Sequence, residues 1–133
     1  MLYYEVLIAY EDLMSKMDYV NLLYRIYGSP KEDKKKFLEE AATWEYYPVY
    51  KEDKVVALFM TKGNRIHCGC LPDYKGRWFP MKMYKRLCKN IILKYGKVET
   101  ATFIETKEFV ERLGFKEVSR NKHNVINFIK TEV

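Results

Sequence analysis

Long apolar runs are missing from this 133-residue sequence. Its apolar stretches, such as Val55 to Met60, fall well short of the roughly 20 residues that a membrane-spanning helix needs. The first residues, MLYYE, also lack the basic region and apolar core of a secretion signal. We therefore expect a protein that is neither membrane-bound nor secreted, with a cytoplasmic location.

Cysteine is scarce: the chain has three, Cys68, Cys70 and Cys88. An odd number without the spacing of a disulfide framework favours free thiols in a reducing compartment. The stretch His67-Cys68-Gly69-Cys70 offers too few ligands for a structural zinc site, whose ligands usually come as spaced pairs. We expect no metal site, and we predict that the cysteines are small core residues.

Internal repeats, low-complexity tracts and Gly/Ser linkers are also absent, so nothing in the sequence marks a domain boundary. The apolar fraction of 48% and the aromatic fraction of 16% are those of a packed globular protein. We predict one domain over residues 1–133.

Acidic residues are absent between Lys75 and Lys97, a segment with eight basic ones. The rest of the chain holds 16 of the 24 basic residues against all 18 acidic ones, so this segment carries the excess of positive charge. We expect an anionic partner near it. For the helix alone, a solvated face that keeps the protein soluble is the simpler interpretation. Nucleic-acid binding, with Trp78 and Phe79 stacking on bases, is a third and less favoured one.

Hydrophobic spacing predicts an alternation of strands and helices. Ser29 and Pro30 are expected to start the second helix, Pro80 to occupy the first turn of the third, and Gly96 to end it. The order indicates an α/β domain of the α+β kind, with a mixed, mostly antiparallel sheet flanked by helices. We expect strands at residues 2–9, 46–50, 55–61, 65–71, 98–103, 115–119 and 125–131, and helices at 11–26, 30–43, 80–95 and 106–113.

The turn at residues 70–80, CLPDYKGRWFP, links a predicted strand to a predicted helix. The start of a helix presents unpaired N–H donors and the positive end of the helix dipole. Gly76, between Lys75 and Arg77, lets a ligand approach the backbone closely. The turn is therefore a candidate site for a phosphate or a pyrophosphate.

Two motifs resemble the GNAT superfamily of N-acetyltransferases. The stretch Leu71 to Trp78, LPDYKGRW, is similar to the family's Leu-Pro-x-Tyr-Arg-Gly-x-Gly turn. The stretch Phe109 to Lys116, FVERLGFK, is similar to the family's Leu-Tyr-Glu-Lys-Leu-Gly-Phe. The resemblance covers about residues 46–131 and looks most like the small acetyltransferase-like proteins of bacteriophages, which would place the protein in a host cytoplasm.

The resemblance implies acetyl-CoA as the cofactor and direct transfer of its acetyl group to an amine, without an acyl-enzyme. Backbone groups near Cys70 and Leu71 are implied to pair with the pantetheine arm and to polarise the acetyl carbonyl. The amides implied to hold the pyrophosphate are those of Lys75, Gly76, Arg77 and Trp78.

The sequence departs from the family pattern at three places. Trp78 replaces the second glycine or alanine of the turn, Val110 stands where a tyrosine often protonates the leaving thiolate, and Phe103 replaces an asparagine. These departures favour an alternative, a catalytically inactive GNAT-fold protein that serves as a phage structural or host-interaction protein and binds a host or virion protein. If the protein is an enzyme, the remaining candidates for the acid are Tyr74, Tyr84 and Tyr95.

His67 is the candidate general base, because it lies three residues before Cys70, where several family members place one. An ordinary histidine pKa near 6.5 suits proton abstraction near neutrality. The alternative is a histidine satisfied by a neighbouring backbone carbonyl. Glu45 and Glu105 are further candidates, although each is more simply a solvated carboxylate.

Overall fold

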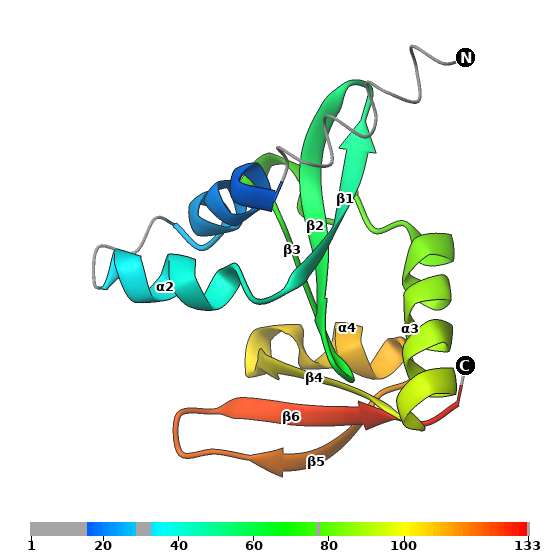
Figure 1. The fold of residues 1–133 in the computed structure, drawn as a ribbon. Helices are drawn as coiled ribbons and strands as arrows, with labels where there is room; N and C mark the ends of the chain where they lie inside the picture. Colours follow the sequence, from blue (N-terminus) through cyan, green and yellow to red (C-terminus); the bar gives the residue numbers. More distant parts are fainter. Residues whose placement is uncertain (1–15, 29–32, 77, 133) are drawn as a thin grey trace. The chain divides into compact units, whose positions relative to one another are not determined.

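In a computed structural model of the chain, residues 16–28, 33–76 and 78–132 are described (Figure 1). The strand predicted at residues 2–9 and the helix start predicted at Ser29 and Pro30 lie outside these ranges. The helix predicted from residue 11 is present over residues 16–26. Among the described residues, no helix is long and apolar enough to cross a membrane.

The predicted α+β fold is confirmed, with a mixed, mostly antiparallel six-stranded sheet in the order β1-β2-β3-β4-β6-β5. β3 pairs with β4 in parallel at Arg65 and Glu99, whereas β6 pairs antiparallel with both β4 and β5. The elements are α2 (Lys34–Ala41), β1 (Glu45–Lys51), β2 (Lys54–Lys62), β3 (Arg65–Cys70), the 3-10 turn η1 (Pro72–Tyr74), α3 (Met81–Tyr95), β4 (Val98–Phe103), the 3-10 turn η2 (Ile104–Thr106), α4 (Lys107–Arg112), β5 (Lys116–Arg120) and β6 (Val125–Lys130).

Two compact units make up the chain. The first contains the described residues up to Met60 together with Cys68–Trp78, and the second contains Thr61–His67 and the described residues from Phe79 onward. Each unit has its own buried side chains and is described by itself.

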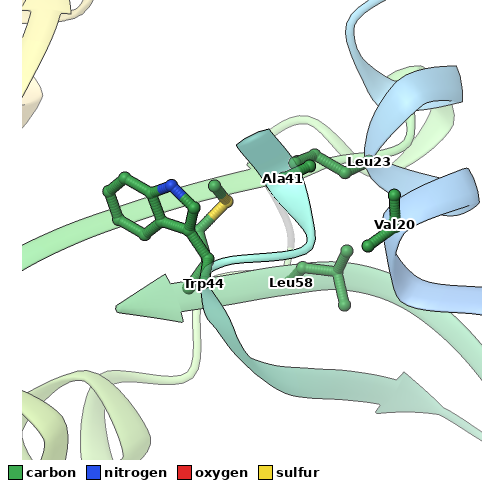
Figure 2. Close-up of a cluster of buried hydrophobic side chains, with 6 residues drawn as sticks. Val20, Leu23, Ala41, Trp44 and Leu58 are labelled. Carbon is green, nitrogen blue, oxygen red and sulfur yellow. The ribbon is translucent and has the colours of Figure 1, made fainter. Parts of the chain in front are cut away.

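The core of the first unit forms where the helix at residues 16–26 and α2 cover β2. Val20 and Leu23, three residues apart on one helix face, lie against Ala41 and Leu58 (Figure 2). Trp44, in the turn between α2 and β1, is buried in the same cluster. The buried members of this cluster are Val20, Leu23, Ala41, Trp44, Leu58 and Met60.

α2 is shorter than predicted. Asp33, not Ser29, is its N-cap, and the Asp33 carboxylate Oδ1 accepts a hydrogen bond from the Lys36 N–H at 3.2 Å. An acidic residue such as Asp33 is favourable both at the N-cap and in the first turn of a helix. From the sequence Asp33 was taken as a first-turn residue, and the predicted helix therefore began too early. The helix also ends at Ala41 rather than at Thr43, whose N–H donates to the Glu40 carbonyl at 3.0 Å.

In the second unit, α3 packs against β4 through its buried apolar face. Pro80 is the N-cap rather than a first-turn residue, a shift of one position that still leaves its missing N–H outside the helix. Gly96 ends the helix as predicted, at φ 82°, with its N–H donating to the Ile92 carbonyl at 2.7 Å. The buried face consists of Tyr84, Leu87, Cys88 and Ile91.

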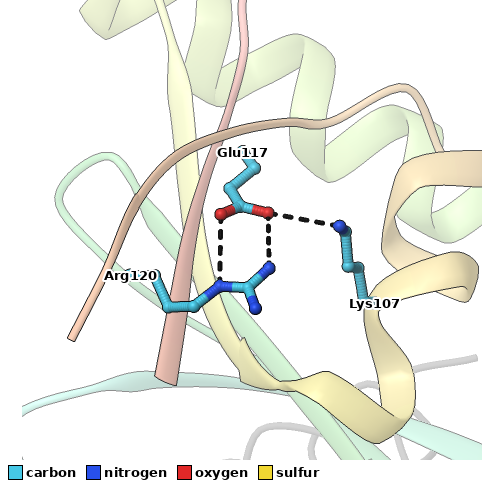
Figure 3. A network of polar contacts seen from close by, with 3 residues as sticks. All are labelled: Lys107, Glu117 and Arg120. Carbon is cyan, nitrogen blue, oxygen red and sulfur yellow. Dashed lines mark hydrogen bonds and ion pairs between the residues drawn. The ribbon is translucent and has the colours of Figure 1, made fainter. Parts of the chain in front are cut away.

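β5 is an exposed strand of the second unit that is held by an ion-pair network (Figure 3). Arg120 donates two hydrogen bonds to the Glu117 carboxylate, at 3.0 Å and 3.3 Å, and Lys107 lies 3.4 Å from it. The hydrogen bond from Arg120 lowers the pKa of Glu117 most, with further contributions from Lys107.

The cysteines are free, as predicted, but they are not all core residues. Cys88 is fully buried, whereas Cys68 is exposed. At the next residue along β3, a Cβ on Gly69 would lie 2.9 Å from the Ile26 side chain, so the helix covers the face of Gly69 and not the face of Cys68. The core prediction for Cys68 is therefore wrong.

Candidate functional site

The turn after β3 has the regular backbone expected of a short structural element. The Leu71 N–H donates to the Val56 carbonyl of β2 at 2.9 Å, which extends the strand pairing by one residue beyond Cys70. The Tyr74 and Lys75 N–H groups then donate back to the Leu71 and Pro72 carbonyls, at 3.0 Å and 3.3 Å. These bonds define η1 and bring the chain to Gly76 in a fixed conformation.

Gly76 has the geometry that a close backbone approach requires. Its φ of +81° lies in the left-handed region, and no atom lies within 4 Å of the position that a Cβ would take. Gly76 and Lys75 are both exposed. Within the described residues, no hydrogen bond uses the Gly76 N–H, so this donor is available to a ligand. Arg77 lies outside the described residues.

Trp78, the largest departure from the family turn, packs within the first unit, against a residue of β2. Its ring centroid lies 5.8 Å from that of Phe59, with the two planes tilted by 51°. Phe59 is buried on β2, and Trp78 is half-buried. The indole therefore packs on the sheet, and the space at Gly76 stays open.

α3 begins two residues after Phe79 without an acidic side chain in its first turn. Its first intrahelical hydrogen bond joins the Tyr84 N–H to the Pro80 carbonyl, at 3.1 Å. The N–H groups before Tyr84 have no place in the helix ladder, and the dipole of a 15-residue helix makes this end positive. An anion is the ligand that such a helix start favours.

His67 is half-buried on β3, three residues before Cys70. Burial, and to a lesser extent the charge of Arg65, lower the pKa of His67 to about 4. The expectation of a pKa near 6.5 is therefore wrong, because a half-buried strand disfavours the imidazolium. At neutral pH the side chain is neutral, the form that accepts a proton, but it holds that proton weakly.

Cys70 also departs from its ordinary titration. Burial raises the pKa of the Cys70 thiol, and the charge of Lys75 offsets part of that rise. No group of three or more potential metal ligands is present among the described residues.

The positions where the family often has polar groups are apolar here. The Val110 side chain is buried in the second unit, and Phe103 is 60% exposed at the end of β4. Of the alternative acids, Tyr84 is buried and its hydroxyl donates to the Leu113 carbonyl at 3.0 Å. Tyr74 lies under the Lys54 ammonium at 5.8 Å, and Tyr95 under that of Lys94 at 5.4 Å.

Glu45 and Glu105 are exposed, in agreement with their interpretation as solvated carboxylates. Glu45 accepts a hydrogen bond from the Tyr47 hydroxyl at 3.2 Å. The described members of the predicted coenzyme site, Cys70, Leu71, Lys75, Gly76 and Trp78, lie in the first unit, whereas His67 belongs to the second.

A polar cluster around Lys130 was not predicted from the sequence. Its ammonium donates to the Leu113 carbonyl at 2.7 Å and to the Tyr84 hydroxyl at 3.3 Å, and it lies 5.3 Å from the centre of the Tyr84 ring. A Cβ on Gly114 would lie 3.2 Å from the Lys130 Cε, so this glycine leaves room for the lysine. The cluster joins α3, the end of α4 and β6, which are distant in the sequence.

No family model matches this sequence, and no curated protein matches it. Solved structures do. One is a GCN5-related N-acetyltransferase from Rhodopseudomonas palustris, with 18% identity, a TM-score of 0.64 and coverage of 76% of this chain and 69% of that chain.

Two further structures are similar over most of both chains. A chimeric spermidine N-acetyltransferase from Vibrio cholerae is 13% identical, with a TM-score of 0.61 and coverage of 84% of this chain and 90% of that one. A Bacillus subtilis acetyltransferase in complex with CoA is 12% identical, with a TM-score of 0.57 and coverage of 85% and 93%. The chain therefore has the fold of the GNAT acetyltransferases.

Proposed function

We propose that this protein is an N-acetyltransferase that binds acetyl-CoA at the turn from Cys70 to Trp78 and transfers the acetyl group to an amine. The observation that carries the proposal is Gly76, which is exposed, has a positive φ, offers a free N–H and precedes a helix start with no acidic side chain. The GNAT fold supports it, since in that fold this turn separates the sheet from the coenzyme-binding helix. The location in the cytoplasm and the likeness to phage proteins remain predictions.

The proposed roles follow the chain. The amides of Gly76, Arg77 and Trp78 hold the pyrophosphate, with the charges of Lys75 and Arg77 beside it. Lys75 contributes its side chain, because its N–H already donates to the Pro72 carbonyl. Cys70 and Leu71 contribute backbone groups to the pantetheine arm. The Leu71 N–H already donates to the Val56 carbonyl, and the Leu71 carbonyl already accepts from the Tyr74 N–H, so the second lone pair of that carbonyl is what remains for the ligand.

Acetyl-CoA supplies the acetyl group as a thioester. Attack by a neutral amine nitrogen forms the new C–N bond, the C–S bond breaks, and the proton that the nitrogen loses is matched by one that the thiolate gains. His67 is the proposed base for the first proton, directly or through water. Its pKa of about 4 keeps it unprotonated over the whole neutral range and makes it a weak base, so proton transfer through water to bulk solvent would complete the step.

Isothermal titration of acetyl-CoA into the protein tests the binding site. We expect saturable micromolar binding, and we expect Gly76→Glu to abolish it, because a carboxylate would occupy the space meant for phosphate. Gly63→Glu is a matched control, since Gly63 also has a positive φ, +59°, and open space at the Cβ position, but lies in the turn between β2 and β3. Absence of binding at millimolar acetyl-CoA would reject the proposal and favour the inactive GNAT-fold alternative.

Release of CoA thiol in the presence of acceptor amines tests the reaction. The first acceptor amines to test are suggested by two enzymes with this fold, a spermidine N-acetyltransferase and a ribosomal-protein-S18-alanine N-acetyltransferase. Spermidine and a peptide with N-terminal alanine are therefore the amines to assay. His67→Ala should lower kcat at least tenfold while sparing the affinity for acetyl-CoA. Unchanged turnover would remove His67 from the mechanism.

A further inference from the structure

The outer face of α3 carries a stripe of cations. Lys82, Lys85, Arg86 and Lys89 recur at the i, i+3, i+4 and i+7 positions of the helix, and all four are exposed. Between residues 82 and 89 every exposed side chain is one of these cations. At a rise of about 1.5 Å per residue, the stripe is roughly 10 Å long.

These four charges have no acidic partner in the part of the chain that the structure describes. The ion pairs found there join Lys97 to Glu99, and Lys107 and Arg120 to Glu117. The sequence from Lys75 to Lys97 contains no acidic residue that could serve as one. The positive potential of this face is therefore not neutralised within its own helix.

This arrangement costs the helix some stability. Like charges at i, i+3 and i, i+4 positions destabilise a helix by about 0.2–0.5 kcal/mol per pair, and Lys82 adds its charge near the positive end of the dipole. The buried face of Tyr84, Leu87, Cys88 and Ile91 holds the helix in place despite that repulsion. A partner that brought negative charges at regular spacing would relieve it.

We propose that the stripe binds the phosphate backbone of a nucleic acid without reading its sequence. Each strand of duplex DNA carries one negative charge per about 3.4 Å of the axis, so a stripe of about 10 Å spans about three phosphates of one strand. Between residues 82 and 89 the stripe has no exposed aromatic or apolar side chain of the kind that anchors protein interfaces, although the exposed Leu93 lies one turn further along the same face. An acidic protein is the other partner that the experiment distinguishes. The stripe shares no residue with the turn proposed for acetyl-CoA.

Fluorescence anisotropy with a labelled 20-base-pair DNA duplex and a labelled single-stranded RNA of the same length tests this proposal. The test variant combines Lys85→Gln, Arg86→Gln and Lys89→Gln, which keep helix propensity and remove three charges. Lys35→Gln, Lys36→Gln and Lys51→Gln remove the same charge from exposed positions elsewhere and form the control variant. Thermal unfolding should show that both variants fold, with the α3 variant at least as stable as the original protein because it loses like-charge repulsion. Titration with acetyl-CoA should give the same affinity for both variants as for the original protein.

We expect the original protein to bind both probes at 50 mM salt, with an affinity that falls steeply as salt rises. In the α3 variant the slope of log affinity against log salt for the duplex should become shallower by about 2.7, and the affinity should fall at least tenfold. The control variant should lose less than threefold. Absence of binding at 50 mM salt, or equal losses in the two variants, would overturn the proposal. Polyglutamate competing as well as unlabelled duplex would also overturn it, and would assign the stripe to acidic proteins.

Discussion

His67 is the residue whose environment departs most from the expectation of the sequence. A histidine on a strand with alternating residues was expected to keep its ordinary pKa, yet burial beside Arg65 lowers the pKa to about 4. Burial depends on what covers the strand, and the residues around His67 in the sequence do not reveal it. At neutral pH the consequence is a neutral imidazole on β3.

The same shift makes folding stability depend on pH. Between pH 6.5 and about 4 the unfolded chain binds a proton on His67 that the folded chain does not, so the free energy of unfolding falls as the pH falls through this window. Above pH 6.5 His67 is neutral in both states, and the free energy of unfolding is at its highest with respect to this residue. Below about pH 4 the free energy of unfolding is lower by about 3 kcal/mol. Urea unfolding at pH 7.5 and pH 5, compared with His67→Gln, measures it. Equal pH dependence in the two proteins would contradict a lowered pKa.

At the scale of elements, the turn after β3 depends on Trp78 for its attachment to β2. We expect Trp78→Ala to lower the free energy of unfolding by about 1–3 kcal/mol, because the contact with Phe59 is lost from a half-buried position. The affinity for acetyl-CoA should change less than threefold, because the space at Gly76 is already open. Chemical denaturation and calorimetric titration measure the two quantities. An increase in affinity of tenfold or more would mean that the indole obstructs the turn.

The Lys130 cluster fixes the start of α3 to the end of α4 and to β6. We expect Lys130→Met to cost about 1–3 kcal/mol of stability, since it removes a charged donor from the Leu113 carbonyl and the Tyr84 hydroxyl. Tyr84→Phe should cost about 1 kcal/mol, and the two changes together should cost less than their sum. A double-mutant cycle from urea unfolding gives this coupling energy. Additive effects would show that the two side chains stabilise the unit independently.

Elements whose ends depend on local chemistry were predictable from the sequence. Gly96 takes the left-handed conformation that ends α3, and the turns around Gly63 and after Lys51 separate the strands as expected. Asp33 and Cys68 were misplaced for different reasons. Several acids and a serine competed for one helix start, and the exposure of Cys68 depends on a helix more than 40 residues earlier in the chain.

The candidate site was predictable only where the backbone determines it. Gly76 was proposed from the resemblance of residues 71–78 to the family turn, and its positive φ is compatible with that proposal. The packing of Trp78 on Phe59 and the contacts of Lys130 join residues 17 or more positions apart, and no local pattern indicates them. Such contacts decide whether a departure from a family motif damages a site or is accommodated.

At the scale of the whole molecule, charge and ligand binding are linked through the segment from Lys75 to Lys97. That segment contributes eight positive charges, and the net charge of the chain is +6. Without an anionic ligand, the repulsion among these charges opposes folding. Phosphate groups bound at Gly76 would reduce this repulsion and would also stabilise the folded state by mass action.

We therefore expect acetyl-CoA to raise the melting temperature of the protein. At about 100 times its dissociation constant, a ligand that binds only the folded state adds about 2.7 kcal/mol, which for a chain of this size corresponds to roughly 10 °C. CoA without the acetyl group should give a similar shift, because the phosphates carry most of the proposed contacts. Differential scanning fluorimetry over a range of concentrations measures the effect, with Gly76→Glu expected to show none and Gly63→Glu to retain it. A shift that survived in Gly76→Glu would place the coenzyme somewhere other than the turn after β3.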